Sequence, residues 1–308
     1  MAQGWKCSGL RWVDGGPVLV WDGGRRSALT WGKRVAFGVA NGGVRTCVGA
    51  RGHACPVRAG VSGRSTGARC EECARLDRAH SVAADTIADD PRPYRVYLAW
   101  FGPGMVKVGI TGVERGSARL LEQGAVCFSW LGTGPLMAAR RTEELLRAAL
   151  RVPDRIPYAD KRAVRSELPG AESERAAEVV ELHARAVALA DWPESLTREP
   201  CRPVDHAGAF GLAELPGAVG EVSELVAGGV VSGELVAAAG PDLHLAVGGG
   251  GDGVPEVVVL DSRLMTGWEL VPVGDGDGTG SGTGDGRRLR FPVREFRGVS
   301  PVVQDELF

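Results

Sequence analysis

Four cysteines, Cys47, Cys55, Cys70 and Cys73, stand at a spacing that suits one metal ion. Only two residues separate the last pair, so a single turn can present both thiolates to a tetrahedral ion. Fourteen residues separate Cys55 from Cys70, which lets the first two cysteines arrive from another loop. The glycine-rich chain between them has few apolar residues, so a metal would supply the missing stability. The pattern predicts a structural zinc ion, with His53 as an alternative ligand in place of Cys47 or Cys55.

The alternative for these cysteines is a set of free or redox-active thiols. Two glutamates lie between Cys70 and Cys73, and the surroundings are rich in glycine rather than typical of a βαβ unit, which disfavours a thioredoxin-like role. The remaining cysteines, Cys7, Cys127 and Cys201, are predicted to be ordinary small buried residues.

Four further residues, Tyr97, Lys107, Arg119 and Glu143, are of types that phosphate chemistry uses. Hydrolysis of a phosphodiester needs an activated water and groups that neutralise developing negative charge, and many enzymes add a metal ion. A lysine can hold a phosphate as a point charge. These residues are therefore candidates for a site that binds or cleaves a phosphodiester.

The elements that must position these residues follow one another closely. Apolar, β-rich runs on either side of Gly102-Pro103-Gly104 predict a hairpin. Gly124 is predicted to end the next helix in a left-handed conformation. The predicted order is strand 94–101, strand 105–111, helix 113–123, strand 125–131 and helix 135–150.

Helix geometry selects Glu143 over its neighbour Glu144. Residues three or four apart share a face of a helix. Glu143 shares its face with apolar residues and is predicted to point inward, whereas Glu144 shares its face with arginines and is predicted to point to solvent. An inward carboxylate needs a partner, because burying it alone is costly.

The order of these elements and residues resembles the GIY-YIG endonuclease superfamily over roughly residues 94–150. Arg95-Val96-Tyr97-Leu98 stands at the place of the first motif and Lys107-Val108-Gly109 at the place of the second. Arg119 and Glu143 fall in helices where that family has its arginine and its metal-binding glutamate. The whole chain also resembles an uncharacterised prokaryotic family that joins such a module to an N-terminal four-cysteine zinc segment.

The resemblance implies a role for each residue. Tyr97 would act as base or orient the water, and Arg119 would clamp the phosphate. Glu143 would hold one Mg²⁺ or Mn²⁺, and Gly109 would let the backbone approach the substrate. Lys107 departs from the family motif, which has a tyrosine there, but a lysine could hold a phosphate as a point charge. The alternative is a common βα scaffold in which Tyr97 is a core aromatic residue and Arg119 forms a structural salt bridge with Glu143.

Composition separates the chain into a basic and an acidic part. The net charge of −2 combines +5 for residues 1–90, +6 for residues 91–170 and −13 for residues 171–308. Such asymmetry predicts either a polyanion partner for the basic part or internal contacts between the two parts, with equal weight. The chain has 44% hydrophobic and 24% charged residues, no long apolar run and no signal-peptide pattern, so it is predicted to be cytoplasmic and without membrane contact.

These patterns predict an α+β protein in several parts. We expect an N-terminal β segment, a zinc knuckle, a GIY-YIG-like β-β-α-β-α module, a helix with a linker, and an acidic, mostly β domain with a disordered loop over residues 274–286. The predicted ranges are 1–46, 47–75, 94–170, 171–204 and 205–308.

The leading functional hypothesis is a metal-dependent nuclease acting on DNA or RNA, with a structural zinc and a catalytic Mg²⁺ or Mn²⁺. The alternative is a catalytically silent, zinc-containing protein that binds nucleic acid. A third hypothesis is a protein-interaction scaffold whose acidic domain masks the basic face.

Overall fold

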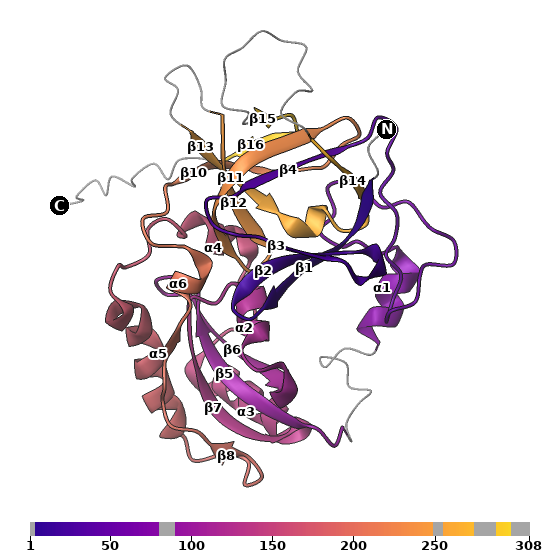
Figure 1. The fold of residues 1–308 in the computed structure, drawn as a ribbon. Coiled ribbons are helices and arrows are strands. Elements are labelled where there is room, and N and C mark those ends of the chain that lie inside the picture. The colour runs from indigo at the N-terminus through magenta and orange to yellow at the C-terminus, as the bar shows by residue number, and fades with distance from the viewer. Residues whose placement is uncertain (1–3, 80–89, 249–254, 274–287, 297–308) are drawn as a thin grey trace, which may run out of the picture.

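A computed structural model describes residues 4–79, 90–248, 255–273 and 288–296 of the chain. These residues form two β-sheets, the larger at the top of Figure 1 and the smaller at the bottom, with short helices between them. The predicted α+β class is confirmed, and the structure is rich in sheet. The predicted loop 274–286 lies outside the described residues. No helix of the described part is long and apolar enough to cross a membrane.

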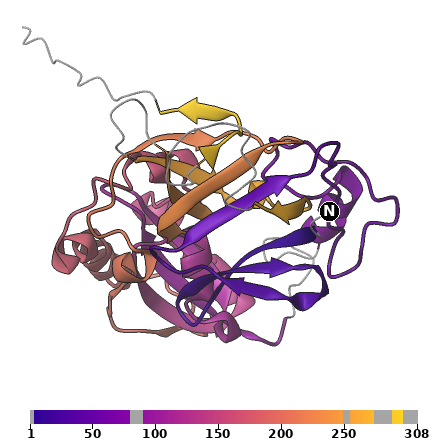
Figure 2. The ribbon, with the colours of Figure 1, turned by 45° about the horizontal axis from the view of Figure 1, so that its top comes forward.

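The larger sheet has eleven strands and is built from both ends of the chain. Strand β4 pairs with β11 on one side and with β14 on the other, both antiparallel. Figure 2 shows this N-terminal strand running beside the orange C-terminal strands. The N-terminal β segment and the acidic region therefore share one sheet. Its strands are β1 (Trp5–Val13), β2 (Gly16–Trp21), β3 (Arg26–Ala28), β4 (Arg34–Val39), β10 (Ala218–Val222), β11 (Val230–Ala239), β12 (Asp242–Val247), β13 (Glu256–Asp261), β14 (Glu269–Pro272), β15 (Arg288–Leu289) and β16 (Val293–Glu295).

The smaller sheet contains the predicted hairpin and third strand. Its order is β6-β5-β7-β8, with β9 also paired to β7. The strands are β5 (Pro93–Trp100), β6 (Val106–Gly112), β7 (Cys127–Pro135), β8 (Thr197–Arg198) and β9 (Val204–Asp205). The helices are α1 (Glu71–Arg78), α2 (Ala118–Gln123), α3 (Leu136–Leu150), α4 (Tyr158–Ala163), α5 (Glu172–Val187) and α6 (Ala207–Phe210). The elements predicted between residues 94 and 150 thus form in the predicted order.

Strand β5 is the centre of the smaller sheet and is buried on both faces. Successive side chains of a strand point to opposite faces, so Val96 and Leu98 join one apolar cluster while Tyr97 joins the other. Helices α3 and α5 both pack against this strand and its neighbours. From Val96 to Trp100 the strand is a continuous apolar run, because both of its faces are covered there.

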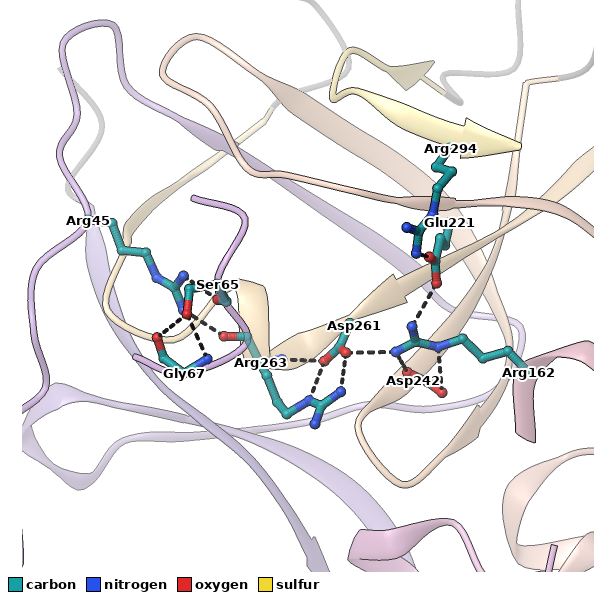
Figure 3. A network of polar contacts seen from close by, with 9 residues as sticks. All are labelled: Arg45, Ser65, Gly67, Arg162, Glu221, Asp242, Asp261, Arg263 and Arg294. Carbon is teal, nitrogen blue, oxygen red and sulfur yellow. Dashed lines mark hydrogen bonds and ion pairs between the residues drawn. The ribbon is translucent and has the colours of Figure 1, made fainter. Parts of the chain in front are cut away.

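A buried network of charges joins helix α4 to the larger sheet (Figure 3). The guanidinium of Arg162 donates to Asp242 at 2.6 and 3.0 Å, to Glu221 at 2.6 Å and to Asp261 at 2.7 Å. Only 10% of the Arg162 side chain is exposed, and the three carboxylates are still more buried. Burial alone would lower the pKa of Arg162, but the carboxylates outweigh it and raise that pKa. Arg294 also pairs with Glu221.

A second buried arginine holds the cysteine-containing segment against the same sheet. Arg45 is 1% exposed and donates to the carbonyl oxygens of Ser62, Thr266 and Arg263 at 2.7 to 2.9 Å. Arg263 in turn binds Asp261 with two donors, so the network in Figure 3 extends to this segment. The cysteine-containing segment, helix α4 and the larger sheet are therefore connected by buried polar contacts.

We expect Arg162→Ala to destabilise the protein by about 3–5 kcal/mol, because it leaves several buried carboxylates without their cation. Arg155→Ala is the control, since Arg155 is exposed and such changes usually stay within about 0.5 kcal/mol. Burial raises the pKa of Asp242 despite Arg162, so the folded state binds its proton more tightly than the unfolded state. Without Arg162 that pKa rises further, and the deficit should shrink as the pH falls. Urea denaturation of both variants at pH 5 and pH 8 measures this, and equal stability of the two variants at pH 8 would contradict it.

Candidate functional site

The four predicted metal ligands lie together in the structure. The Sγ atoms of Cys47, Cys55, Cys70 and Cys73 are all within 4.8 Å of one another, and those of Cys55 and Cys70 are 4.0 Å apart. A zinc ion with bonds of about 2.3 Å to four sulfurs requires sulfur–sulfur distances of about 3.8 Å. The cysteines are therefore positioned to bind a metal ion, and their geometry is consistent with structural zinc. His53 is exposed and does not belong to this group.

Local backbone structure holds these sulfurs in place. The amides of Gly49 and Cys70 donate to the Cys47 sulfur at 3.3 and 3.2 Å. Gly49 has a φ of 78°, and a Cβ there would lie 2.8 Å from the carbonyl carbon of Ala54, so only glycine fits. Burial and the neighbouring sulfurs raise the pKa of the Cys73 thiol. Four thiolates are not stable side by side without a cation, which a bound metal would supply.

The cysteines form their own small apolar cluster. Cys47, Cys55 and Cys73 pack with Ala50 and a few other small residues, separately from the main core. This cluster contains no large apolar side chain, which agrees with the expectation that a metal stabilises the segment. Of the other cysteines, Cys7 and Cys127 are buried as predicted, whereas Cys201 is half-buried.

The other four candidate residues line one cavity of about 900 Å³, here called the central cavity. Tyr97 comes from β5, Lys107 from β6, Arg119 from α2 and Glu143 from α3. Gly109 also lines this cavity. Charged side chains from several elements complete its wall: Asp77, Arg92, Glu114, Arg115, Arg140, Arg147 and Asp154.

Tyr97 is a buried residue that lines the cavity. It is 1% exposed, its ring meets Trp130 edge to face, and its Oη accepts a hydrogen bond from Gln123 Nε2 at 3.0 Å. Burial raises its pKa, so the phenol keeps its proton at neutral pH. The ring crosses Gly109, where a Cβ would lie 2.6 Å from the Tyr97 Cζ. Gly109 is thus required by the packing of Tyr97, independently of any substrate.

Lys107 is nearly buried at the cavity wall. It is 9% exposed, its Nζ donates to the carbonyl of Asp154 at 3.3 Å, and it lies 5.6 Å from the Tyr97 ring centre. Burial, with a contribution from Arg119, lowers its pKa to about 8. Its ammonium is therefore charged at neutral pH but loses its proton under mildly alkaline conditions.

Glu143 and Arg119 do not pair with each other. Arg119 has only a weak ion pair, 4.0 Å, with Glu122, which already binds Arg115 at 2.6 Å. Glu143 is half-buried, and burial followed by the charge of Asp154 raises its pKa. Glu144 is exposed and does not line the cavity. The alternative of a structural Arg119–Glu143 salt bridge is therefore wrong, although Tyr97 is a core aromatic residue as that alternative proposed.

Several cavity residues were not selected from the sequence. Gly124 ends α2 with a φ of 71°, as predicted. Gln123 is buried and orients the Tyr97 hydroxyl. Arg140 and Arg147 lie at a spacing that places them on one face of α3. The sequence predicted only that this face points to solvent. Asp154 follows α3 in a loop and carries no sequence signal of its own.

The chain was compared with known protein families. The family described as "Protein of unknown function (DUF2797)" matches residues 32–270, so the chain belongs to that family. No curated protein and no solved structure matches the chain. One family match thus includes part of the N-terminal β segment, the four cysteines, the described residues of the central cavity and most of the acidic region.

The predicted relationship to the GIY-YIG superfamily is wrong. The matching family is one of unknown function, and no comparison indicates GIY-YIG. The prediction rested on a few residue types spread over a short α/β unit, and such units occur in many unrelated proteins. The roles that the resemblance implied for Tyr97, Lys107, Arg119 and Glu143 must therefore be argued from the cavity alone.

We expect the purified protein to contain about one zinc ion per chain, the count for a closed four-ligand site. Cys73→Ser should lose the metal and lower the melting temperature, because binding energy of a structural metal is folding energy. Cys201→Ser is the matched control, since Cys201 lies outside the cluster. Elemental analysis and thermal melts measure both effects, and a folded, metal-free wild-type protein would contradict the expectation.

Proposed function

We propose that the central cavity binds the phosphodiester backbone of a nucleic acid, in a protein whose cysteine segment holds a structural zinc. The observation that carries the proposal is the convergence of six cationic side chains on one cavity: Arg92, Lys107, Arg115, Arg119, Arg140 and Arg147. Phosphate contacts from lysine and arginine are the main source of affinity for nucleic acids.

The balance of charge in the cavity favours an anion. Over the described residues, its wall carries six cations and four carboxylates, and two of these carboxylates already have arginine partners there. Glu114 lies 3.6 Å from Arg92, and Asp154 lies 3.4 Å from Arg147. Within the described residues Lys107 has no carboxylate at ion-pair distance, and its hydrogen bond goes to a carbonyl. An incoming phosphate would give a counter-charge to Lys107 and to Arg119, whose one ion pair among the described residues, with Glu122, is 4.0 Å long.

Lys107 gives this proposal a pH test. Because burial lowers its pKa to about 8, its charge is present below that pH and lost above it. Affinity for a nucleic acid should therefore fall between pH 7 and pH 9. Lys107→Arg should remove the fall, because arginine keeps its charge throughout. Lys107→Met should bind weakly at both pH values and reduce the slope of log affinity against log salt by about 0.7, the value for one phosphate contact to a single strand.

Arg155→Met is the control for that experiment, since Arg155 is exposed and does not line the cavity. Fluorescence anisotropy with labelled oligonucleotides gives the affinities. The proposal fails if no oligonucleotide binds, or if Lys107→Met and Arg155→Met have the same affinity and salt slope.

A second candidate function is metal-dependent hydrolysis of the bound phosphodiester, and Glu143 is the observation that favours it. Its carboxylate lies in the cavity beside Asp154, makes no ion pair among the described residues, and has a raised pKa. A divalent cation would offset the repulsion between the two carboxylates. The protonated Tyr97 hydroxyl, held by Gln123, would orient a water rather than remove its proton. In this candidate function, Glu143 and Asp154 would hold one Mg²⁺ or Mn²⁺ ion, and observed cleavage would support that assignment.

For this candidate, Glu143→Gln should reduce cleavage in Mg²⁺ or Mn²⁺ by at least about 100-fold, the scale for losing one group that stabilises transition-state charge. Binding should stay within about twofold, because the amide keeps the shape of the side chain. Glu144→Gln on the exposed face of α3 is the matched control. Cleavage assays on single-stranded, duplex and branched substrates measure this, and normal cleavage by Glu143→Gln would exclude the mechanism while leaving the binding function intact.

A further inference from the structure

A second cavity lies next to the central cavity and shares one arginine with it. This second cavity has a volume of about 430 Å³ and lies between the cysteine segment, strand β1 and helix α2. Arg119 lines both cavities. The two hollows therefore meet at a single guanidinium, and a ligand that occupies one can extend past Arg119 into the other.

Arginines also dominate the wall of the second cavity. Arg11, Arg69, Arg119 and Arg263 line it, whereas Glu122 is its one carboxylate among the described residues. Each arginine comes from a different part of the chain: β1, the cysteine segment, α2 and the loop after β13. The cations converge through folding, as they do in the central cavity.

The four arginines differ in what already neutralises them. Arg263 donates two hydrogen bonds to Asp261, so its charge is already neutralised within the network of Figure 3. Arg69 forms an ion pair with Asp77 at 3.3 Å and donates a hydrogen bond to the carbonyl oxygen of Gly49. Arg11 donates only to the carbonyl of its neighbour Leu10 among the described residues, at 3.3 Å.

The glutamate of the second cavity does not alter this balance. Glu122 is held by Arg115 at 2.6 Å, and its distance to Arg119 is 4.0 Å. Among the described residues, Arg11 therefore has no carboxylate partner and Arg119 has only the long ion pair with Glu122, so both present positive charge to the second cavity. An anion with successive negative groups would meet them in turn.

We infer that the two cavities form one track for a single nucleic-acid strand, with Arg119 at the junction and Arg11 and Arg69 binding the phosphates beyond it. This inference rests on the proposed function of the central cavity and extends it to a substrate class. A duplex is read by a helix or β-ribbon that projects into a groove, but here the cations line hollows. A single strand, whose backbone follows a charged groove, fits that arrangement.

The track also gives the cysteine segment a role beyond its own stability. Arg69 immediately precedes the ligand Cys70, and Val48, Gly67 and Ala68 of the same segment line the second cavity. The metal site therefore fixes one wall of the track. Arg45, buried beneath the segment, fixes the same wall against the larger sheet.

The test compares the affinities of single strands of about 2 and about 10 nucleotides, each as DNA and as RNA. The longer strand is within the range of known single-strand binding sites. The wild-type protein should bind the longer strand at least about tenfold more tightly, the scale of one additional charged hydrogen bond. Arg11→Glu should remove most of this gain and should weaken binding of the short strand much less, because Arg11 does not line the central cavity. Arg69→Ala should also weaken binding of the longer strand. This variant tests the wall that the cysteine segment forms.

Arg26→Glu is the matched control, because Arg26 is an exposed arginine of β3 that lines neither cavity. Equal binding of the longer strand by Arg11→Glu and Arg26→Glu would overturn the track, as would tighter binding of a duplex of the same length. Binding of the short strand alone would leave the central cavity as the whole site. Absence of binding by either length would instead overturn the proposed function itself. Thermal melts of each variant confirm that it is folded.

Discussion

The buried guanidinium of Arg162 is the contact on which the arrangement of this protein depends. It gathers Glu221, Asp242 and Asp261 from three strands of the larger sheet onto the short helix α4. The adjacent residue Lys161 donates to the carbonyl of Gln123 at 3.1 Å, and Gln123 in turn donates to Tyr97. One helix of six residues thus connects the larger sheet to the wall of the central cavity. Hydrogen bonds from Lys161 to Gln123 and from Gln123 to Tyr97 therefore connect this helix to the Tyr97 hydroxyl.

The end of helix α2 explains why so much positive charge is buried there. The last carbonyls of a helix lack partners within it and carry partial negative charge. Lys161 binds one of these carbonyls, and Arg165 binds the next, that of Gly124, at 3.1 Å. Burial lowers the pKa of Lys161 to about 7. This pKa is lowered because the ammonium group that binds the helix carbonyl is removed from water. Arg119, which lines both cavities, belongs to the same short helix.

The local part of this structure could be predicted from the sequence, and the long-range part could not. The hairpin, the helices of residues 94–150 and the cysteine cluster depend on patterns within a few tens of residues, and all of them form. Strand β4 instead inserts between β11 and β14, a pairing that no local pattern specifies. Arg162 finds carboxylates 59 to 99 residues away. The family prediction failed for a related reason, because four residue types on a short α/β unit do not identify one superfamily.

The charge asymmetry of the chain has two consequences in the folded protein, and the sequence could not divide the cations between them. Some arginines of the basic part pair internally with the acidic part: Arg162 with Asp242, and Arg64 with Glu224 at 2.7 Å. The acidic region also supplies neighbours to β4, so it is an integral part of the larger sheet and not a detachable mask over the basic face. Among the described residues, Arg11 and Arg119 have incomplete internal pairing, and each of them lines at least one of the two cavities. Folding therefore uses one set of cations to build the protein and leaves another set facing the space where we propose a phosphodiester binds.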